Sequence, residues 1–139
     1  MSLDRFLEAQ NHVYDDVLSE LYSGRKRTHW MWFIFPQIAG LGRSSTAKFY
    51  AIKNLHEAHA YLNHPVLGSR LVECAETLLR IQGKSANDIF GYPDDMKLKS
   101  SMTLFASIAG DDSPFSAVLK RYFHGELDKL TLDEILPKP

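Results

Sequence analysis

The chain has 139 residues, an ordinary length for one domain, and we expect residues 1–139 to form a single domain. Apolar residues make up 45% of the chain and charged residues 24%, a composition that excludes a disordered protein. The formal net charge of −1 gives no overall positive field, so a nucleic-acid partner is not expected.

The amino-terminal sequence MSLDRFLEAQ lacks the cationic and then apolar pattern of a signal peptide, so we expect a cytoplasmic protein. From Leu3 to Leu21, apolar residues recur at steps of three and four, which predicts one amphipathic helix. Gly24 is typical of a helix end. The basic segment 25–27 that follows is either a solvated connector or the rim of a pocket for an anionic ligand.

The most apolar window is HWMWFIFPQIAGLG, residues 29–42, which is too short to span a membrane. It predicts a short helix ended by Pro36, although Trp32–Phe35 is also the one candidate for a strand. Trp30 and Trp32 are two residues apart and cannot share a helical face. Either both indoles only fill the core, or one fills the core while the other lines a cavity and stacks on a planar ring.

Three polar residues accompany this window. We expect His29 to be partly buried, either as a core residue bonded to a carbonyl or as a site residue. Gln37 either ties down the backbone of its loop or contacts the edge of a ligand. The segment GLGRSS, with Arg43, is either a capped turn or an anion site at the start of a helix.

Further helices are predicted over residues 46–53, 54–62 and 65–81. Asn54 and Glu57 have the spacing of a capping box. Cys74 falls on an apolar helical face, where a small buried residue is favoured over a nucleophile. His56 and His59 could neighbour each other on a helix, but we favour solvated side chains and expect neither a metal nor a cofactor.

Pro93 opens a helix that has Asp94 in its first turn. Lys97 and Ser100 are three residues apart and share one face. They either form hydrogen bonds at a helix surface or belong to a site in which Lys97 holds an anion and Asp94 is a general base. Helices are also predicted after Ser113 and, from a second capping-box spacing, after Thr131. Because no segment has the alternation of a strand, we predict an all-α fold of six to eight helices with short loops.

Three long motifs carry a resemblance: HWMWFIFPQIAGLGRSSTAKFYAI, LNHPVLGSRL and FGYPDDMKLKSSMTLFA. They resemble a family of small bacterial and fungal proteins without an established activity, domain-of-unknown-function family 1810, whose members are sometimes labelled calpastatin. The resemblance implies a compact, mostly helical domain, and Tyr50 and Arg70 match the family pattern. The chain is also similar, more distantly, to small helical N-glycosidases that act on ADP-ribose-type substrates.

These patterns lead to a functional hypothesis, a pocket for a planar, nucleotide-like or ADP-ribose-like molecule with an anionic part, in a binder or an N-glycosidase-type hydrolase. The catalytic candidates are Asp94, Lys97 and His29. The ligand-binding candidates are Trp30, Trp32, Gln37, Arg43, Tyr50, Arg70 and Ser100. The alternative is a non-enzymatic domain for protein interaction, including a homodimer.

Overall fold

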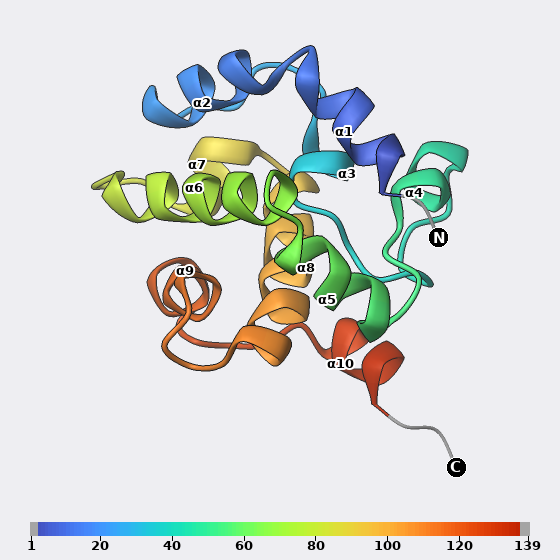
Figure 1. Ribbon diagram of the computed structural model, residues 1–139. Helices are drawn as coiled ribbons and strands as arrows, with labels where there is room; N and C mark the ends of the chain where they lie inside the picture. Colours follow the sequence, from blue (N-terminus) through green and yellow to red (C-terminus); the bar gives the residue numbers. More distant parts are fainter. Residues whose placement is uncertain (1–2, 137–139) are drawn as a thin grey trace.

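The computed structural model describes residues 3–136; residues 1–2 and 137–139 lie outside the described part (Figure 1). Within residues 3–136 the chain forms ten α-helices and no strand, so the all-α prediction is confirmed and the expected six to eight helices was too few. The helices are α1 (Asp4–Asn11), α2 (Tyr14–Tyr22), α3 (Met31–Ile34), α4 (Ser45–Tyr50), α5 (Leu55–Asn63), α6 (Leu67–Arg80), α7 (Ala86–Phe90), α8 (Asp94–Ala109), α9 (Pro114–Phe123) and α10 (Lys129–Ile135).

The prediction of one helix over Leu3–Leu21 was wrong, because the helix is interrupted between Asn11 and Tyr14. Asn, His and a β-branched Val stand in a row at residues 11–13, and all three have weak helix propensity. The side chain of Asn11 is also held by a hydrogen bond from Arg70 on α6, with a distance of 3.0 Å. The apolar face continues on both sides of the break, so periodicity alone did not reveal it.

The strand interpretation of Trp32–Phe35 was also wrong, because the segment forms the single turn α3. Pro36 follows it, and the chain then makes one isolated parallel bridge between Ile38 and Ile52. In this bridge Ala39 N donates to Ile52 O and Ile52 N donates to Gln37 O, both at 2.8 Å. The bridge gives hydrogen-bond partners to an extended backbone that enters the core.

The long helix α8 runs through the middle of the molecule (Figure 1). It contacts α5, α7, α9 and α10, while α6 contacts α2, α5 and α9. Because neighbours surround it, even polar members of α8 such as Ser101 and Thr103 are buried. Within residues 3–136, no helix combines the length and the apolar character that a membrane span requires.

A series of aromatic rings in contact with one another connects α1, α5, α8 and α9 through the core. Phe6 on α1 packs edge-on against Tyr61 on α5, with ring centres 5.0 Å apart. Tyr61 contacts Phe105 of α8 at 5.6 Å, and Phe105 contacts Phe115 of α9 at 5.8 Å. All four rings are buried, and aromatic pairs of this kind stabilise a fold beyond the area that they bury.

Most of the predicted helix starts are confirmed. The Asn54 side chain accepts a hydrogen bond from Glu57 N, and Ser113 caps α9 with Pro114 at its first position. The capping box predicted at Thr131 was wrong, because α10 begins two residues earlier and Asp128 is its cap. Aspartate and threonine are both favoured as helix N-caps, so a capping-box spacing at Thr131 did not distinguish Thr131 from the actual cap, Asp128.

Gly68 lets α5 and α6 approach each other closely. A Cβ at this position would lie 1.9 Å from the carbonyl oxygen of Leu62, which is far inside van der Waals contact. That oxygen belongs to the backbone, so it cannot rotate away. The sharp turn between the two helices therefore requires a residue without a side chain.

We predict that Gly68→Ala lowers the free energy of unfolding by about 1–3 kcal/mol, the usual cost of forcing atoms into a packed site. The sign of this change is informative, because replacing Gly by Ala within a helix ordinarily stabilises the helix by about 1 kcal/mol. Urea denaturation measures the change. The matched control is Ser69→Ala, at an exposed neighbouring position of α6, and an equal effect of both variants would contradict the close-approach argument.

Candidate functional site

Two lysines and one aspartate form an ion-pair cluster where α8 begins. Asp94, in the first turn of α8, places Oδ2 3.0 Å from Nζ of Lys26 and Oδ1 3.7 Å from Nζ of Lys97. Lys26 comes from the loop after α2, and Lys97 lies one turn further along α8. We call these three residues, together with Trp32, the Lys26–Asp94–Lys97 site.

Each lysine also lies over an indole ring. The Nζ of Lys26 is 5.1 Å from the centre of the Trp30 ring, and the Nζ of Lys97 is 5.1 Å from the centre of the Trp32 ring. Trp30 is 1% exposed and packs against Phe90 in the core, whereas Trp32 is only partly buried. The two indoles thus differ in burial, and the partly accessible Trp32 ring lies beside a cation but lines none of the five described cavities.

The two lysines differ in how firmly they are held. The side chain of Lys26 is 8% exposed, and its Nζ also donates to the carbonyl oxygen of Thr28 at 2.6 Å. Such a buried ammonium group requires these partners. Lys97 is 25% exposed and has the longer ion pair, so its ammonium group can leave Asp94 without leaving a buried charge alone.

The loop that carries Lys26 is wrapped around the carboxylate of Glu20. Glu20 accepts hydrogen bonds from Arg27 N at 2.5 Å, from Thr28 N at 2.9 Å, from Thr28 Oγ1 at 2.7 Å and from Trp30 Nε1 at 3.1 Å. Burial raises the pKa of this carboxyl, but the four hydrogen bonds together outweigh burial and hold the pKa below its ordinary value. The carboxylate therefore fixes the loop at the end of α2.

Glu20 and Lys26 were absent from the predicted site residues. Lys26 belongs to the basic segment 25–27, which the sequence allowed to be either a solvated connector or the rim of a pocket. A signal for Glu20 does exist in the sequence, because it lies three residues after Val17 on the buried face of α2. A carboxylate on an apolar face needs hydrogen-bond partners, and the following loop supplies them.

The expectation that His29 is partly buried was wrong, because its side chain is exposed. The hydrogen bonds to Glu20 fold the loop so that Trp30, and not His29, enters the core. His29 directly follows Thr28, whose carbonyl receives Lys26, so its backbone borders the Lys26–Asp94–Lys97 site.

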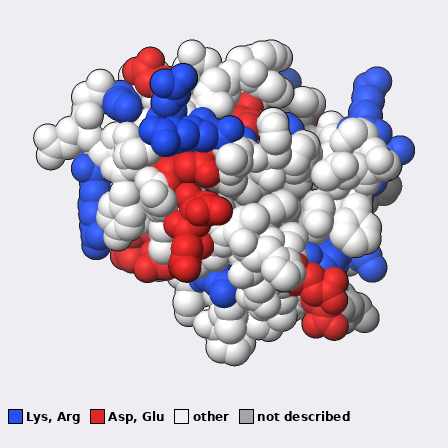
Figure 2. Space-filling model, turned by 90° about the horizontal axis from the view of Figure 1, so that it is seen from above, with Lys and Arg blue, Asp and Glu red and all other residues white. Residues whose placement is uncertain are grey.

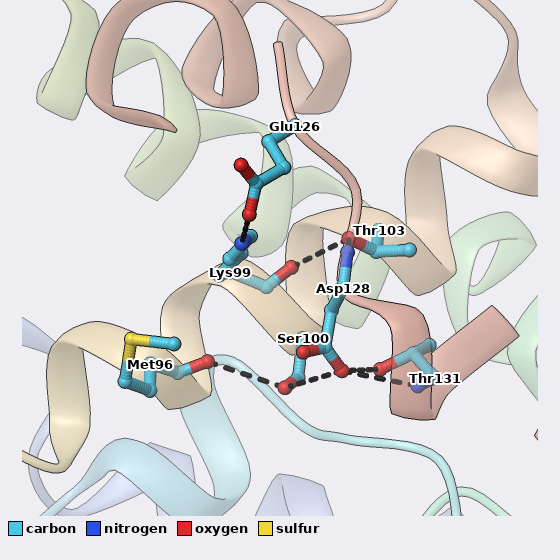
Figure 3. Close-up of polar contacts among 7 residues, drawn as sticks. All are labelled: Met96, Lys99, Ser100, Thr103, Glu126, Asp128 and Thr131. Carbon is cyan, nitrogen blue, oxygen red and sulfur yellow. Dashed lines mark hydrogen bonds and ion pairs between the residues drawn. The ribbon is translucent and has the colours of Figure 1, made fainter. Parts of the chain in front are cut away.

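Ser100 lies on α8 in a different network, shown in Figure 3. Its hydroxyl is 3.2 Å from Met96 O and 3.1 Å from Oδ2 of Asp128. The same Oδ2 accepts from Thr131 N at 3.0 Å and from Thr131 Oγ1 at 2.5 Å, while Asp128 N donates to Thr103 Oγ1 at 2.9 Å. The geometry thus gives Ser100 a structural task, which is to join α8 to the start of α10.

The remaining predicted residues lie in other surroundings. Arg70 donates to Asn11 and lies over the Tyr14 ring, and Tyr50 packs against Phe6 and Phe33. The side chains of Gln37 and Arg43 make no hydrogen bond or ion pair with other residues of the described part. The described contacts do not connect these four residues with the Lys26–Asp94–Lys97 site.

Cavities lie elsewhere on the surface. The largest of the five described, about 620 Å³, runs along α6 from the end of α5 to Tyr22, the last residue of α2. A smaller one of about 330 Å³ lies among α8, α9 and α10, and one of about 530 Å³ is lined by Arg5, Lys48 and Lys53. None of these five is lined by a residue that the sequence predicted for the site.

The geometry also bears on metal binding and on the reactivity of the Cys74 thiol. Within residues 3–136 there is no group of three His, Cys, Asp or Glu side chains that could hold a metal ion. Cys74 is fully buried as predicted, and burial raises the pKa of its thiol to about 12. A thiol in this state is a poor nucleophile, because the thiolate is the reactive form.

We predict that Glu20→Gln lowers the free energy of unfolding by about 1–3 kcal/mol at neutral pH, because a buried donor loses its acceptor. Since folding lowers the pKa of Glu20, its stabilisation is complete above the ordinary value of 4.5 and is lost as the pH falls through the folded-state pKa. Urea denaturation from pH 7 to pH 3 should therefore show a smaller acid-side loss for the variant than for the wild type.

The control for this experiment is Glu8→Gln, which changes an exposed carboxylate on α1. It should keep both the stability and the acid-side slope of the wild type. If Glu20→Gln retained the full slope, the lowered pKa of Glu20 would not contribute to stability.

We also predict that Asp128→Ala destabilises the protein by about 0.5–2 kcal/mol, the usual value of a lost helix cap. Hydrogen exchange should accelerate most in α10, because this helix loses its cap and its link to Ser100. Asp133→Ala, at an exposed position of the same helix, is the control. Unchanged exchange in α10 would show that the network in Figure 3 is not needed to hold the helix.

Comparison with known proteins gives the same family as the three sequence motifs. The family model described as "Protein of unknown function (DUF1810)" matches residues 1–135. No curated protein matches the chain. A crystal structure of the conserved hypothetical protein Rv1873 from Mycobacterium tuberculosis is 49% identical and has a TM-score of 0.95, with 98% of this chain and 97% of that chain covered. The chain therefore belongs to the DUF1810 family of proteins of unknown function.

Proposed function

We propose that this protein binds a small planar molecule with an anionic part, of the nucleotide or ADP-ribose class, at the Lys26–Asp94–Lys97 site. The observation that supports the proposal is an ammonium group, that of Lys97, held over a partly accessible indole. A nucleotide has a group that fits each of these side chains. Its flat base can stack on the Trp32 indole, and its phosphate can pair with the ammonium group of Lys97.

The two lysines have different tasks in this proposal. Lys26 is nearly buried and pairs with Asp94, so it positions the carboxylate and does not contact the ligand. Lys97 is more accessible and exchanges its weaker ion pair with Asp94 for a pair with the ligand phosphate. Tyr92, which is 81% exposed and two residues before Asp94, adds a second aromatic side chain near the start of α8.

If the protein is also an N-glycosidase-type hydrolase, Asp94 is the residue for the chemical step. Cleavage of a glycosidic bond builds positive charge on the sugar, and a fixed carboxylate stabilises that charge. Lys26 keeps this carboxylate at the edge of the site. His29, exposed on the adjoining loop, is the remaining candidate for proton transfer.

Isothermal titration with ADP-ribose and with AMP tests the proposal. We expect binding by the wild type, and a loss of affinity of at least about tenfold in Lys97→Ala, consistent with one lost charge-assisted contact of about 1.5–3 kcal/mol. Trp32→Leu should weaken binding similarly, because it removes the stacking surface. Lys120→Ala is the control, because this exposed lysine lies on α9.

Absence of binding at millimolar ligand, or equal affinity in Lys97→Ala and the wild type, would overturn the proposal. Release of free adenine during incubation, as water replaces the base on the ribose, would add the hydrolase step to the binding. If neither ligand binds and sedimentation shows a stable dimer, the alternative of a protein-interaction domain would be favoured instead.

A further inference from the structure

A cavity at the end of α4 is lined by basic and apolar side chains. Its volume is about 530 Å³, and its lining residues are Arg5, Ala39, Lys48, Phe49, Ala51 and Lys53. None of these six carries a carboxylate, hydroxyl or amide side chain. Small-molecule sites commonly have volumes of roughly 300–1,000 Å³, so this cavity is large enough for one. We call it the Lys48–Lys53 cavity.

Arg5 is a structural member of the cavity wall. Its Nε donates to the carbonyl oxygen of Phe49 at 2.8 Å, and its Nη2 donates to Ala51 O at 3.0 Å and to Oε1 of Glu57 at 2.9 Å. Glu57 is fully buried, and its ion pair with Arg5 balances the guanidinium charge. Arg5 therefore fixes the end of α4 against α1 without adding an uncompensated charge to the cavity.

The charges of Lys48 and Lys53 remain uncompensated. Both side chains are exposed, and within residues 3–136 neither forms a hydrogen bond or an ion pair. Lys48 lies in the last turn of α4, where the helix dipole favours a cation, but Arg5 already binds carbonyl oxygens at that end. Glu134 lines an adjoining cavity together with Lys53, yet its carboxylate lies against Gly40 and does not pair with the lysine. The described fold thus leaves two positive charges in one cavity unused.

The ring of Phe49 gives the cavity an accessible flat surface. It is 58% exposed and packs edge-on against Tyr50, with ring centres 4.8 Å apart. On the other side of the cavity, Ala39 N donates to Ile52 O at 2.8 Å, which holds Ala39 beside the segment that carries Ala51. An exposed aromatic ring that is fixed in this way can stack on a planar ligand.

The surface on this side of the molecule has the same sign of charge. In Figure 1, α4 lies at the right, beside the start of α1. Figure 2 shows the molecule from above, and basic side chains project from the upper part of its right edge, where the neighbouring surface is uncharged. An anion that approaches this side meets a positive potential that no adjacent acid cancels.

The charges and the lining together select the ligand. Two ammonium groups balance a dianion, and a phosphate monoester carries about −1.5 to −2 charges at neutral pH, more than a carboxylate or a sulfonate. The lining side chains offer donors and apolar surface but no acceptor, so a ligand rich in hydrogen-bond donors would lack partners. An aromatic ring attached to the phosphate needs no such partner and can stack on Phe49.

We propose that the Lys48–Lys53 cavity binds a small aryl phosphate monoester, independently of the Lys26–Asp94–Lys97 site. The phosphate pairs with the ammonium groups of Lys48 and Lys53, and the aromatic ring stacks on Phe49. Arg5 keeps its partners in the complex and holds the end of α4 in place.

Isothermal titration with phenyl phosphate tests the proposal. The matched ligands are inorganic phosphate, which lacks the ring, phenol, which lacks the phosphate, and benzenesulfonate, which has the ring and a single charge. We expect phenyl phosphate to bind, and each matched ligand to bind at least about tenfold more weakly, because each lacks one of the contacts.

Variants locate the binding. Lys48→Gln and Lys53→Gln should each weaken the binding of phenyl phosphate at least about fivefold, and Phe49→Ala should do the same, because each removes one contact from an exposed position. Lys120→Gln and Lys129→Gln are the controls, since they change exposed lysines on α9 and α10.

Absence of binding at about 10 mM phenyl phosphate, a very weak affinity, would overturn the proposal. Equal binding of any matched ligand, or unchanged binding by Lys48→Gln and Lys53→Gln, would do the same. Lys97→Ala should bind phenyl phosphate like the wild type. A loss confined to Lys97→Ala would assign the ligand to the Lys26–Asp94–Lys97 site instead, so failures of the two proposals are distinguished by different variants.

Discussion

The carboxylate of Glu20 is the interaction on which the candidate site depends. Its four hydrogen bonds hold residues 27–30 against the end of α2 and send the Trp30 indole into the core. With the loop in this position, Lys26 lies over Trp30 and reaches Asp94 at the start of α8. A buried acid on one helix thus positions the charged groups that another helix presents.

The same contacts explain why an apolar segment ends at a polar site. Residues 31–35 belong mainly to the core, and a segment so apolar gains little from charged neighbours. Lysine side chains resolve the conflict, because their ammonium groups lie over the indole rings and also pair with Asp94. Trp32 is covered in this way by Lys97 without being enclosed, which distinguishes it from Trp30.

Features encoded by local sequence were predictable, and those created by tertiary contacts were not. The caps at Asn54 and Ser113 follow from spacing within a few residues. The break between α1 and α2 and the exposure of His29 depend on hydrogen bonds to residues far away or on the folding of a loop. Ser100 matched a functional spacing with Lys97, but its partner Asp128 lies 28 positions further along and no periodicity reveals it.

Similarity of fold does not settle the chemistry, because the relative with a TM-score of 0.95 is itself a conserved hypothetical protein. The more useful distinction lies among the charged groups. Lys26 and Asp94 stabilise each other, so replacing either one changes the stability of the fold as well as any function. The side chains of Lys48 and Lys53 pair with nothing in the described part, and Lys97 could leave its partner without isolating a buried charge. Side chains whose loss leaves no buried charge without a partner are therefore the ones whose replacement best separates function from stability.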